Sequence, residues 1–231
     1  MNDDEFDHDA KRFVAGAGDL GISLSPEQVQ QFRHYRDLVI EWNQRLNLTR
    51  IASEDFVPLH FLDSLSLMSF LPQKRPLRLL DLGSGAGFPG IPLVIAGYDL
   101  DVTLLEATQK KARFLTQAMS ALELSRISIL PFRAEEAARL DGHRYGYDVV
   151  AARAVAPLDR LCGWMLPFLK PDGIAIAMKS STARTQDELR NSEKAIQQAG
   201  GEIMKTVKFD LPTTDIQRML VLITRRRRRD R

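Results

Sequence analysis

From Leu77 onward the chain alternates short apolar runs with amphipathic segments, and this alternation limits the fold more than any other feature. The apolar runs have the length of buried strands, and the segments between them repeat apolar residues at helical spacing. The predicted strands are 77–81, 102–106, 127–131, 147–152, 174–179, 202–209 and 218–224. Helices are predicted from the glycine-rich loop to about residue 96 and over 108–124, 134–140, 158–169 and 186–199. Strands and helices in this order predict an α/β fold with a doubly wound, mostly parallel sheet.

The connections refine this prediction at the end of the chain. A turn, Lys170-Pro171-Asp172-Gly173, is predicted to separate the helix at 158–169 from the strand at 174–179. Only a short loop joins the last two strands, which is too short for a parallel crossover. We therefore expect an antiparallel last strand.

The first 75 residues have a different pattern. Residues 1–24 are expected to be loosely structured, with one short helix near residues 11–18. Ser25, Pro26 and Gln28 form the signature of a helix start with a capping box, and apolar residues at helical spacing follow as far as Leu46. A second helix is predicted over 58–71. These patterns divide the chain into a helical cap at 1–75, a sheet domain at 76–224 and a basic tail at 225–231.

Charge and cysteine content limit the compartment and the partners. Net charge is only +2, but the first ten residues hold five acids and the last seven hold six arginines. The arginine run is either a solvated tail or a source of nonspecific nucleic-acid affinity. A single cysteine and four scattered histidines give no pattern for a disulfide or a metal site. No apolar leader and no run of about 18 apolar residues is present, so a cytoplasmic protein without a membrane span is expected.

The glycine-rich loop after the first predicted strand is the candidate ligand site. Open parallel sheets bind ligands at the carboxyl ends of their strands, and glycines allow a ligand to approach the backbone closely. Residues 85–90 match the G-x-G-x-x-G dinucleotide pattern, but Pro89 and Pro92 remove amides that a pyrophosphate would need. Asp81 just before the glycines would also repel pyrophosphate. A carboxylate there suits the cationic amino-acid end of S-adenosylmethionine, so a methyltransferase is favoured over a dinucleotide enzyme or a purely structural turn.

Further candidates follow the later strands. Glu106 ends the second strand, where an acid can accept both hydroxyl hydrogens of a ribose. Ala134 and Glu135 follow the third strand and could meet an adenine ring, although Glu135 could instead be a charge favoured at a helix start. Arg153 follows the fourth strand, near the expected methyl group, or forms a surface ion pair. Lys179 ends the fifth strand and is either a nucleic-acid contact or a solvated side chain.

Five segments of the sequence together are more specific than the glycine loop alone. They are 41–49 (EWNQRLNLT), 60–64 (HFLDS), 81–92, 133–136 and 152–154. On these segments the chain resembles, over nearly its whole length, the bacterial 16S ribosomal RNA guanine-N7 methyltransferases, the RsmG family formerly called glucose-inhibited division protein B. The first two segments lie outside the generic methyltransferase fold and carry most of the specificity.

The resemblance implies a class I S-adenosylmethionine-dependent methyltransferase fold and transfer of a methyl group to N7 of one guanine in 16S ribosomal RNA. The implied partner is the 30S subunit or its precursor, in the small-subunit decoding region, and a monomer is expected. The implied cofactor contacts are Gly83, Phe88, Ala134, Glu135 and Arg153, and Glu106 stands where the family often has Asp. Asp81 and Gly85 join this set from the loop argument above.

Guanine N7 has a lone pair and no proton near neutral pH, so the reaction needs alignment rather than a general base. No catalytic base is therefore predicted, and Arg153 is a candidate for positioning the cofactor or the guanine. Asn47 and Thr49 are expected to cap a helix. His60 either lines the RNA entrance or packs in the core, and it could hydrogen-bond to Asp63, one helical turn away. Two alternatives stay open: a methyltransferase of another RNA or a small molecule, and a binding protein that has lost catalysis.

Overall fold

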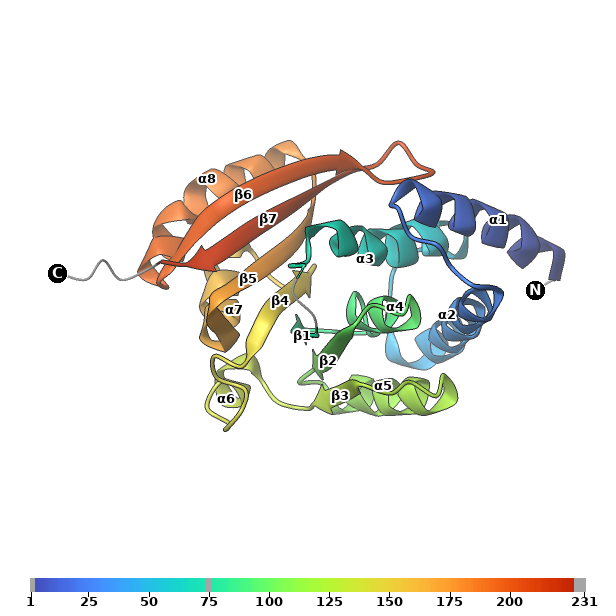
Figure 1. The fold of residues 1–231 in the computed structure, drawn as a ribbon, viewed down its shortest axis with the longest axis horizontal. Coiled ribbons are helices and arrows are strands. Elements are labelled where there is room, and N and C mark those ends of the chain that lie inside the picture. The colour runs from blue at the N-terminus through green and yellow to red at the C-terminus, as the bar shows by residue number, and fades with distance from the viewer. Residues whose placement is uncertain (1–2, 74–75, 227–231) are drawn as a thin grey trace.

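The computed structural model describes residues 3–73 and 76–226, and its centre is a seven-stranded sheet with the strand order β3-β2-β1-β4-β5-β7-β6 (Figure 1). Strands β1 to β5 pair in parallel, and β7 is antiparallel to both β5 and β6. The predicted sheet and its antiparallel last strand are confirmed. The strands are β1 Leu77–Leu82, β2 Leu100–Leu105, β3 Ile127–Leu130, β4 Tyr147–Arg153, β5 Leu169–Ser180, β6 Gly201–Asp210 and β7 Gln217–Arg225.

Helices cover both faces of this sheet. The α-helices are α1 Asp3–Asp19, α2 Pro26–Leu46, α3 Asp63–Leu65, α4 Gly90–Ile95, α5 Gln109–Ala121, α6 Ala134–Ala137, α7 Leu158–Met165 and α8 Ala183–Gln198. Short 3₁₀ segments are Ser53–Asp55, Ser66–Phe70 and Leu166–Phe168, and Val57–Leu62 is a π-helical segment.

Alternate side chains of the strands enter two separate cores. Leu79 and Ile176 belong to the core that also contains buried residues of α1 to α5. Leu80 and Ala175, one position away on each strand, belong to the core beneath α6, α7 and α8. Because successive strand residues point to opposite faces, the apolar runs of the sequence fill both layers.

The N-terminal region is more ordered than its sequence predicts. Residues 3–19 form one long helix, α1, so the expectation of a loose segment with a short helix is wrong. The Phe13 ring lies 4.8 Å from the Phe32 ring and 5.5 Å from the Phe61 ring, centroid to centroid. These buried aromatic contacts stabilise α1 although its own sequence has few helix signals.

Helix α2 begins as predicted. The Gln28 N–H donates to Ser25 Oγ at 3.2 Å, and the Ser25 N–H donates to Gln28 Oε1 at 2.8 Å, which completes the capping box. The helix ends at Leu46, and Asn47 adopts a left-handed conformation with φ of 49°. Asparagine tolerates this conformation better than most residues, so the predicted capping role of Asn47 is confirmed.

One predicted local structure is irregular and another is wrong. The helical stretch predicted over 58–71 is confirmed at 57–70, but it is π-helical, then α-helical, then 3₁₀. The hydroxyls of Ser64 and Ser66 donate to the carbonyls of His60 and Asp63, at 2.6 Å each, and so compete for acceptors of a regular helix. The predicted turn at 170–173 lies inside β5, where the pairing with β4 shifts register. Turn-forming residues there make an irregularity within a strand.

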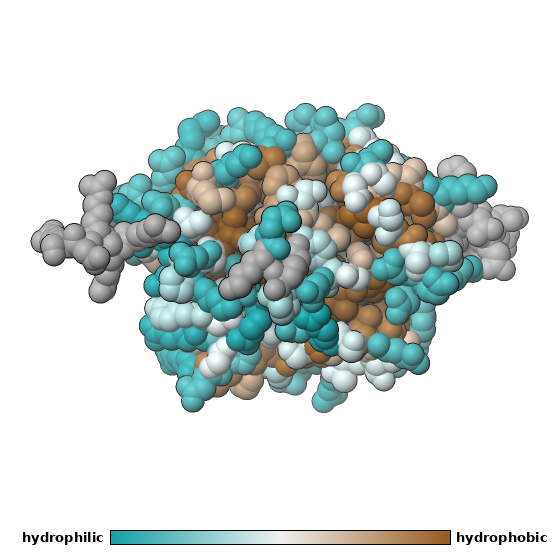
Figure 2. Space-filling view, in the orientation of Figure 1, coloured by the Kyte–Doolittle hydropathy of each residue, from teal (hydrophilic) through white to brown (hydrophobic). Residues whose placement is uncertain are grey.

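The predicted division at residue 75 stays a prediction, although α1 and α2 share a core with one face of the sheet. Arg225, at the start of the predicted tail, is the last residue of β7, and residues 227–231 lie outside the described part of the chain. Within the described residues, no helix has both the length and the hydropathy that crossing a membrane requires. The face shown in Figure 2 has a mainly hydrophilic outline, with hydrophobic residues gathered nearer its middle.

Candidate cofactor and substrate site

A cavity of about 820 Å³ lies at the carboxyl ends of β1, β4 and β5. Such a volume is typical of a ligand pocket. Its walls come from the glycine-rich loop, the segment after α2, the π-helical segment and the start of α8. The residues that line it are 47–51, Leu59, His60, Asp63, Gly83, Ser84, Gly85, Ala86, Phe88, Lys111, Arg153, Ala154, 178–180, Arg184, Thr185, Glu188 and Arg218.

Glycine is required in the loop for conformation and for space. Gly83, Gly85 and Gly87 have φ of +73°, +59° and +99°, all in the region that favours glycine. A Cβ atom at Gly83 would lie 2.7 Å from Val155, and one at Gly87 would lie 2.5 Å from Ile91. At Gly85 the nearest atom is 3.9 Å away, so a side chain there would have open space beside the cavity.

Asp81 is hydrogen-bonded to two residues of the loop. Its Oδ2 accepts the Gly90 N–H at 3.0 Å, and the Ser84 hydroxyl donates to its carbonyl at 2.9 Å. Among the described residues, Oδ1 has no hydrogen-bond partner. Burial raises the pKa of Asp81 to about 7, against the opposing effects of the Gly90 N–H and the Arg153 charge. The carboxyl is fully buried and is not part of the cavity lining.

Glu106 supports the same loop from the end of β2. Its Oε2 accepts the Gly85 N–H at 3.0 Å, and its Oε1 accepts the Thr108 N–H at 2.7 Å. Each carboxylate oxygen keeps a second lone pair that a hydroxyl could use. Glu106 thus lies where the sequence predicted an acid, directly beneath the loop.

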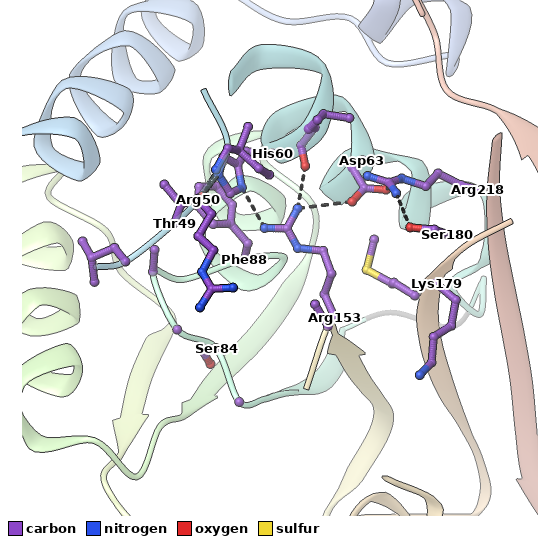
Figure 3. Close-up of a pocket in the computed structure, with 18 of the residues that line it drawn as sticks. Thr49, Arg50, His60, Asp63, Ser84, Phe88, Arg153, Lys179, Ser180 and Arg218 are labelled. Atoms are coloured by element: carbon purple, nitrogen blue, oxygen red, sulfur yellow. Dashed lines mark hydrogen bonds and ion pairs between the residues drawn. The ribbon is translucent and has the colours of Figure 1, made fainter. Parts of the chain in front are cut away.

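Arg153 joins the sheet to the N-terminal region (Figure 3). Its Nη1 donates to the Leu59 carbonyl at 2.8 Å and lies 3.2 Å from Asp63 Oδ2, and its Nη2 lies 2.8 Å from His60 Nδ1. The guanidinium also lies 4.9 Å above the centre of the Phe88 ring. Asp63 is itself buried, so these contacts differ from the surface ion pair that the sequence left open.

His60 is a packed, uncharged histidine that also lines the cavity. Its ring stacks on Phe88 with centroids 4.1 Å apart, and its Nε2 lies 2.8 Å from Thr49 Oγ1. Burial and the nearby Arg153 charge lower the pKa of His60 to about 2. Its packing role is therefore confirmed, and its place at an RNA entrance stays a prediction. His60 and Asp63 do not bond to each other as the sequence suggested, because both contact Arg153 instead.

The cavity wall is strongly basic. Six cationic residues and two acids line it: Arg50, Lys111, Arg153, Lys179, Arg184 and Arg218 against Asp63 and Glu188. Lys179 donates to Glu188 at 2.7 Å and to the Ala156 carbonyl at 2.8 Å, so it is not a solvated lysine, and its contact with nucleic acid stays a prediction. Arg50, Lys111 and Arg184 make no hydrogen bond or ion pair with any described residue, which leaves an uncompensated positive charge at the cavity.

The structure brings together half of the predicted site residues at the cavity itself. Gly83, Gly85, Phe88 and Arg153 line it, Asp81 and Glu106 lie beneath the loop, and Ala134 and Glu135 begin α6 outside the lining, with Glu135 exposed. Sequence reasoning missed Arg184 and Arg218 as cavity residues and treated Thr49 only as a helix cap. Arg218 had no local signal, because it reaches the site only when β7 inserts beside β5.

The strand order, the antiparallel β7 and the glycine loop after β1 define a class I S-adenosylmethionine-dependent methyltransferase. Two solved structures share this fold. One is the ribosomal protein L11 methylase of Lactobacillus delbrueckii subsp. bulgaricus, with a TM-score of 0.53, 19% identity, and coverage of 72% of this chain and 77% of that one. The other is M. jannaschii TYW2 in complex with AdoMet, with a TM-score of 0.51, 13% identity, and coverage of 66% and 71%.

Sequence comparison narrows the class to a family. The profile of the GidB family, rRNA small subunit methyltransferase G, matches residues 28–219. A relative from Lachnoclostridium phytofermentans, ribosomal RNA small subunit methyltransferase G, is 43% identical over 93% of this chain and 88% of that protein. The chain belongs to the rRNA small subunit methyltransferase G family, and it is an S-adenosylmethionine-dependent methyltransferase.

Proposed function

We propose that this chain transfers a methyl group from S-adenosylmethionine to N7 of a guanine in 16S ribosomal RNA, in the small-subunit decoding region. Family membership supports ribosomal RNA as the substrate. The acid–base character of the cavity supports N7 as the acceptor atom.

The observation that carries this proposal is that, among the described residues, no acid or histidine lining the cavity is free to accept a proton. His60 has a pKa of about 2 and already accepts a hydrogen bond from Arg153. Asp63 lies in ion pairs with Arg153 and Arg218, at 3.2 and 3.0 Å, and Glu188 pairs with Lys179. An exocyclic amine would have to lose a proton on methylation, whereas N7 has none to lose. The described residues therefore favour the ring nitrogen.

The residues present fit the cofactor. S-adenosylmethionine supplies the electrophilic methyl group. Gly83 and Gly85 have no side chain, so the cofactor could approach the backbone there. Both have positive φ, so any other residue would strain the loop. The second lone pairs of Glu106 would accept the ribose hydroxyl hydrogens. The ionised form of Asp81, beneath the loop, would favour the cationic amino-acid end.

Four further residues complete the proposed cofactor site. Ala134 and Glu135 would contact the adenine through a backbone amide and a side-chain acid. Phe88 and Arg153 would shape the end of the cavity where the methyl lies. The Phe88 ring is enclosed by His60 and Arg153, so its position is fixed before any ligand arrives.

The basic cavity also points to the form of the substrate. Arg50, Lys111 and Arg184 would bind phosphates of folded RNA, and this favours a polyanion over a small neutral molecule. We propose that the enzyme acts as a cytoplasmic monomer on the 30S subunit or its precursor, whose shape selects one accessible guanine.

Transfer of labelled methyl from S-adenosylmethionine tests the proposal. The acceptors are 30S subunits that lack the modification, 50S subunits and naked 16S RNA. We expect label in the 16S RNA of the 30S particle at one guanine. Label confined to large-subunit RNA or to ribosomal protein would contradict the proposal.

A further inference from the structure

Thr49 is held at the wall of the cavity by three hydrogen bonds. Its hydroxyl oxygen accepts the Ile51 N–H at 3.0 Å and lies 2.8 Å from His60 Nε2, and its own N–H donates to Asn43 Oδ1 at 2.9 Å. These contacts fix the position of the hydroxyl before any ligand binds. Figure 3 shows Thr49 and His60 on the same side of the cavity as Phe88.

Arg153 sets the direction of the hydrogen bonds that reach Thr49. A guanidinium only donates, so His60 Nδ1, 2.8 Å from Arg153 Nη2, must present a lone pair. The single proton of the neutral ring is then on Nε2. That N–H points at Thr49 Oγ1 and donates to it. The Leu59 carbonyl and Asp63 hold the guanidinium in place, so this direction is built into the fold.

A threonine hydroxyl has two lone pairs and one proton. Here His60 and Ile51 use both lone pairs, and the proton of Thr49 has no acceptor among the residues that the structure describes. A hydroxyl that normally accepts and donates is thereby limited to donation, at a position that lines the cavity.

We infer that Thr49 is a specificity-determining residue that donates a hydrogen bond to O6 of the target guanine. The inference rests on the proposed function, since O6 lies beside N7 on the same base edge. Adenine carries an amino group at that position, which is also a donor. A hydroxyl restricted to donation therefore accepts guanine and opposes adenine, and His60 and Arg153 act as positioning residues for it. A site that must hydrogen-bond its substrate rejects an analogue without the partner atom.

The test combines two variants with two bases. Thr49→Val removes the hydroxyl at nearly constant volume, and Thr49→Ser keeps it. The 30S substrate is reassembled with 16S RNA that has either guanine or 2-aminopurine at the methylated position. 2-Aminopurine keeps N7 but lacks O6, and any change in N7 reactivity affects all enzymes equally.

For the wild type we expect kcat/KM to fall about tenfold from guanine to 2-aminopurine, in addition to the intrinsic change in reactivity. The kcat/KM of Thr49→Val on guanine should be about tenfold below that of the wild type. From guanine to 2-aminopurine it should fall only by the intrinsic change in reactivity. Thr49→Ser should behave as the wild type on both bases. Affinity for S-adenosylmethionine should stay unchanged in both variants.

Two results would overturn the role of Thr49, and a third would overturn the proposed function on which it rests. Full activity of Thr49→Val on guanine, or an equal loss on both bases, shows that the hydroxyl does not contact O6. An equal loss is also what a merely structural role would produce. Failure of the wild-type enzyme to methylate guanine N7 refutes the proposed function itself, and it is measured in the same experiment.

Discussion

The buried carboxyl of Asp81 should make the stability of this protein depend on pH in a defined way. Burial raises its pKa from 3.8 to about 7, so the native state holds this proton more tightly than the unfolded state. The associated stability is fully present below about pH 4 and is lost as pH rises through 7. At 1.36 kcal/mol per pH unit the whole window amounts to about 4 kcal/mol. Between pH 5 and 8 the loss is about 2.5 kcal/mol.

Asp81→Asn removes this titration and keeps an amide oxygen for the Gly90 N–H. The free energy of unfolding is measured by urea denaturation at pH 5 and pH 8 for wild type and variant. The wild type should lose about 2.5 kcal/mol more than the variant over this interval. Asp215→Asn, at an exposed position, is the control and should follow the wild type. A pH dependence that is the same in Asp81→Asn and wild type would show that the Asp81 carboxyl is not the group that titrates.

Three further predictions concern the loop, the arginine bridge and the basic wall. Gly85→Ala and Gly21→Ala both place a side chain at positive φ in open space, and each should lower the free energy of unfolding by about 1 kcal/mol. Only Gly85→Ala should also weaken S-adenosylmethionine binding, measured by calorimetry. Equal affinities of the two variants would contradict the proposed position of the cofactor. Arg153→Lys keeps the charge but loses the forked contacts of the guanidinium. The melting temperature should fall by several degrees, and the rate of methyl transfer should fall by about 100-fold. An unchanged rate would show that the forked contacts are dispensable. Arg184→Gln should reduce the salt dependence of 30S binding by a slope of about one, and an unchanged slope would exclude a phosphate contact.

The sheet and α2 could be predicted because their signals are local. Each buried strand is an apolar run, and Ser25, Pro26 and Gln28 mark the start of α2 by hydrogen bonds within four residues. Helix α1 could not be predicted in full, because its stability comes from rings such as Phe32 and Phe61 that are distant in the sequence. The irregular stretch at 57–70 depends on serine hydroxyls whose choice of acceptor is settled only in the folded chain.

In the site too, local features could be predicted from the sequence, and contacts between distant residues could not. The loop at 83–90 and the acid at Glu106 follow from strand ends, and the structure places both at one edge of the sheet. The contact between Arg153 and Leu59 joins residues 94 positions apart, and no spacing rule in the sequence predicts it. The role inferred for Thr49 depends on that contact, because Arg153 fixes the His60 tautomer. Resemblance to a family marked the segments that contain Thr49, His60 and Arg153, and the structure supplied the direction of each hydrogen bond.

The chemical identity of the methylated nucleoside shows whether the enzyme transfers the methyl group to N7 of guanine. Unmodified 30S subunits are incubated with the enzyme and S-adenosylmethionine, and the 16S RNA is digested to nucleosides and analysed by mass spectrometry against standards. We expect 7-methylguanosine, close to one per particle, and none after omission of the enzyme. A methyl group on the exocyclic amine of guanine, or on any adenine, would contradict this expectation.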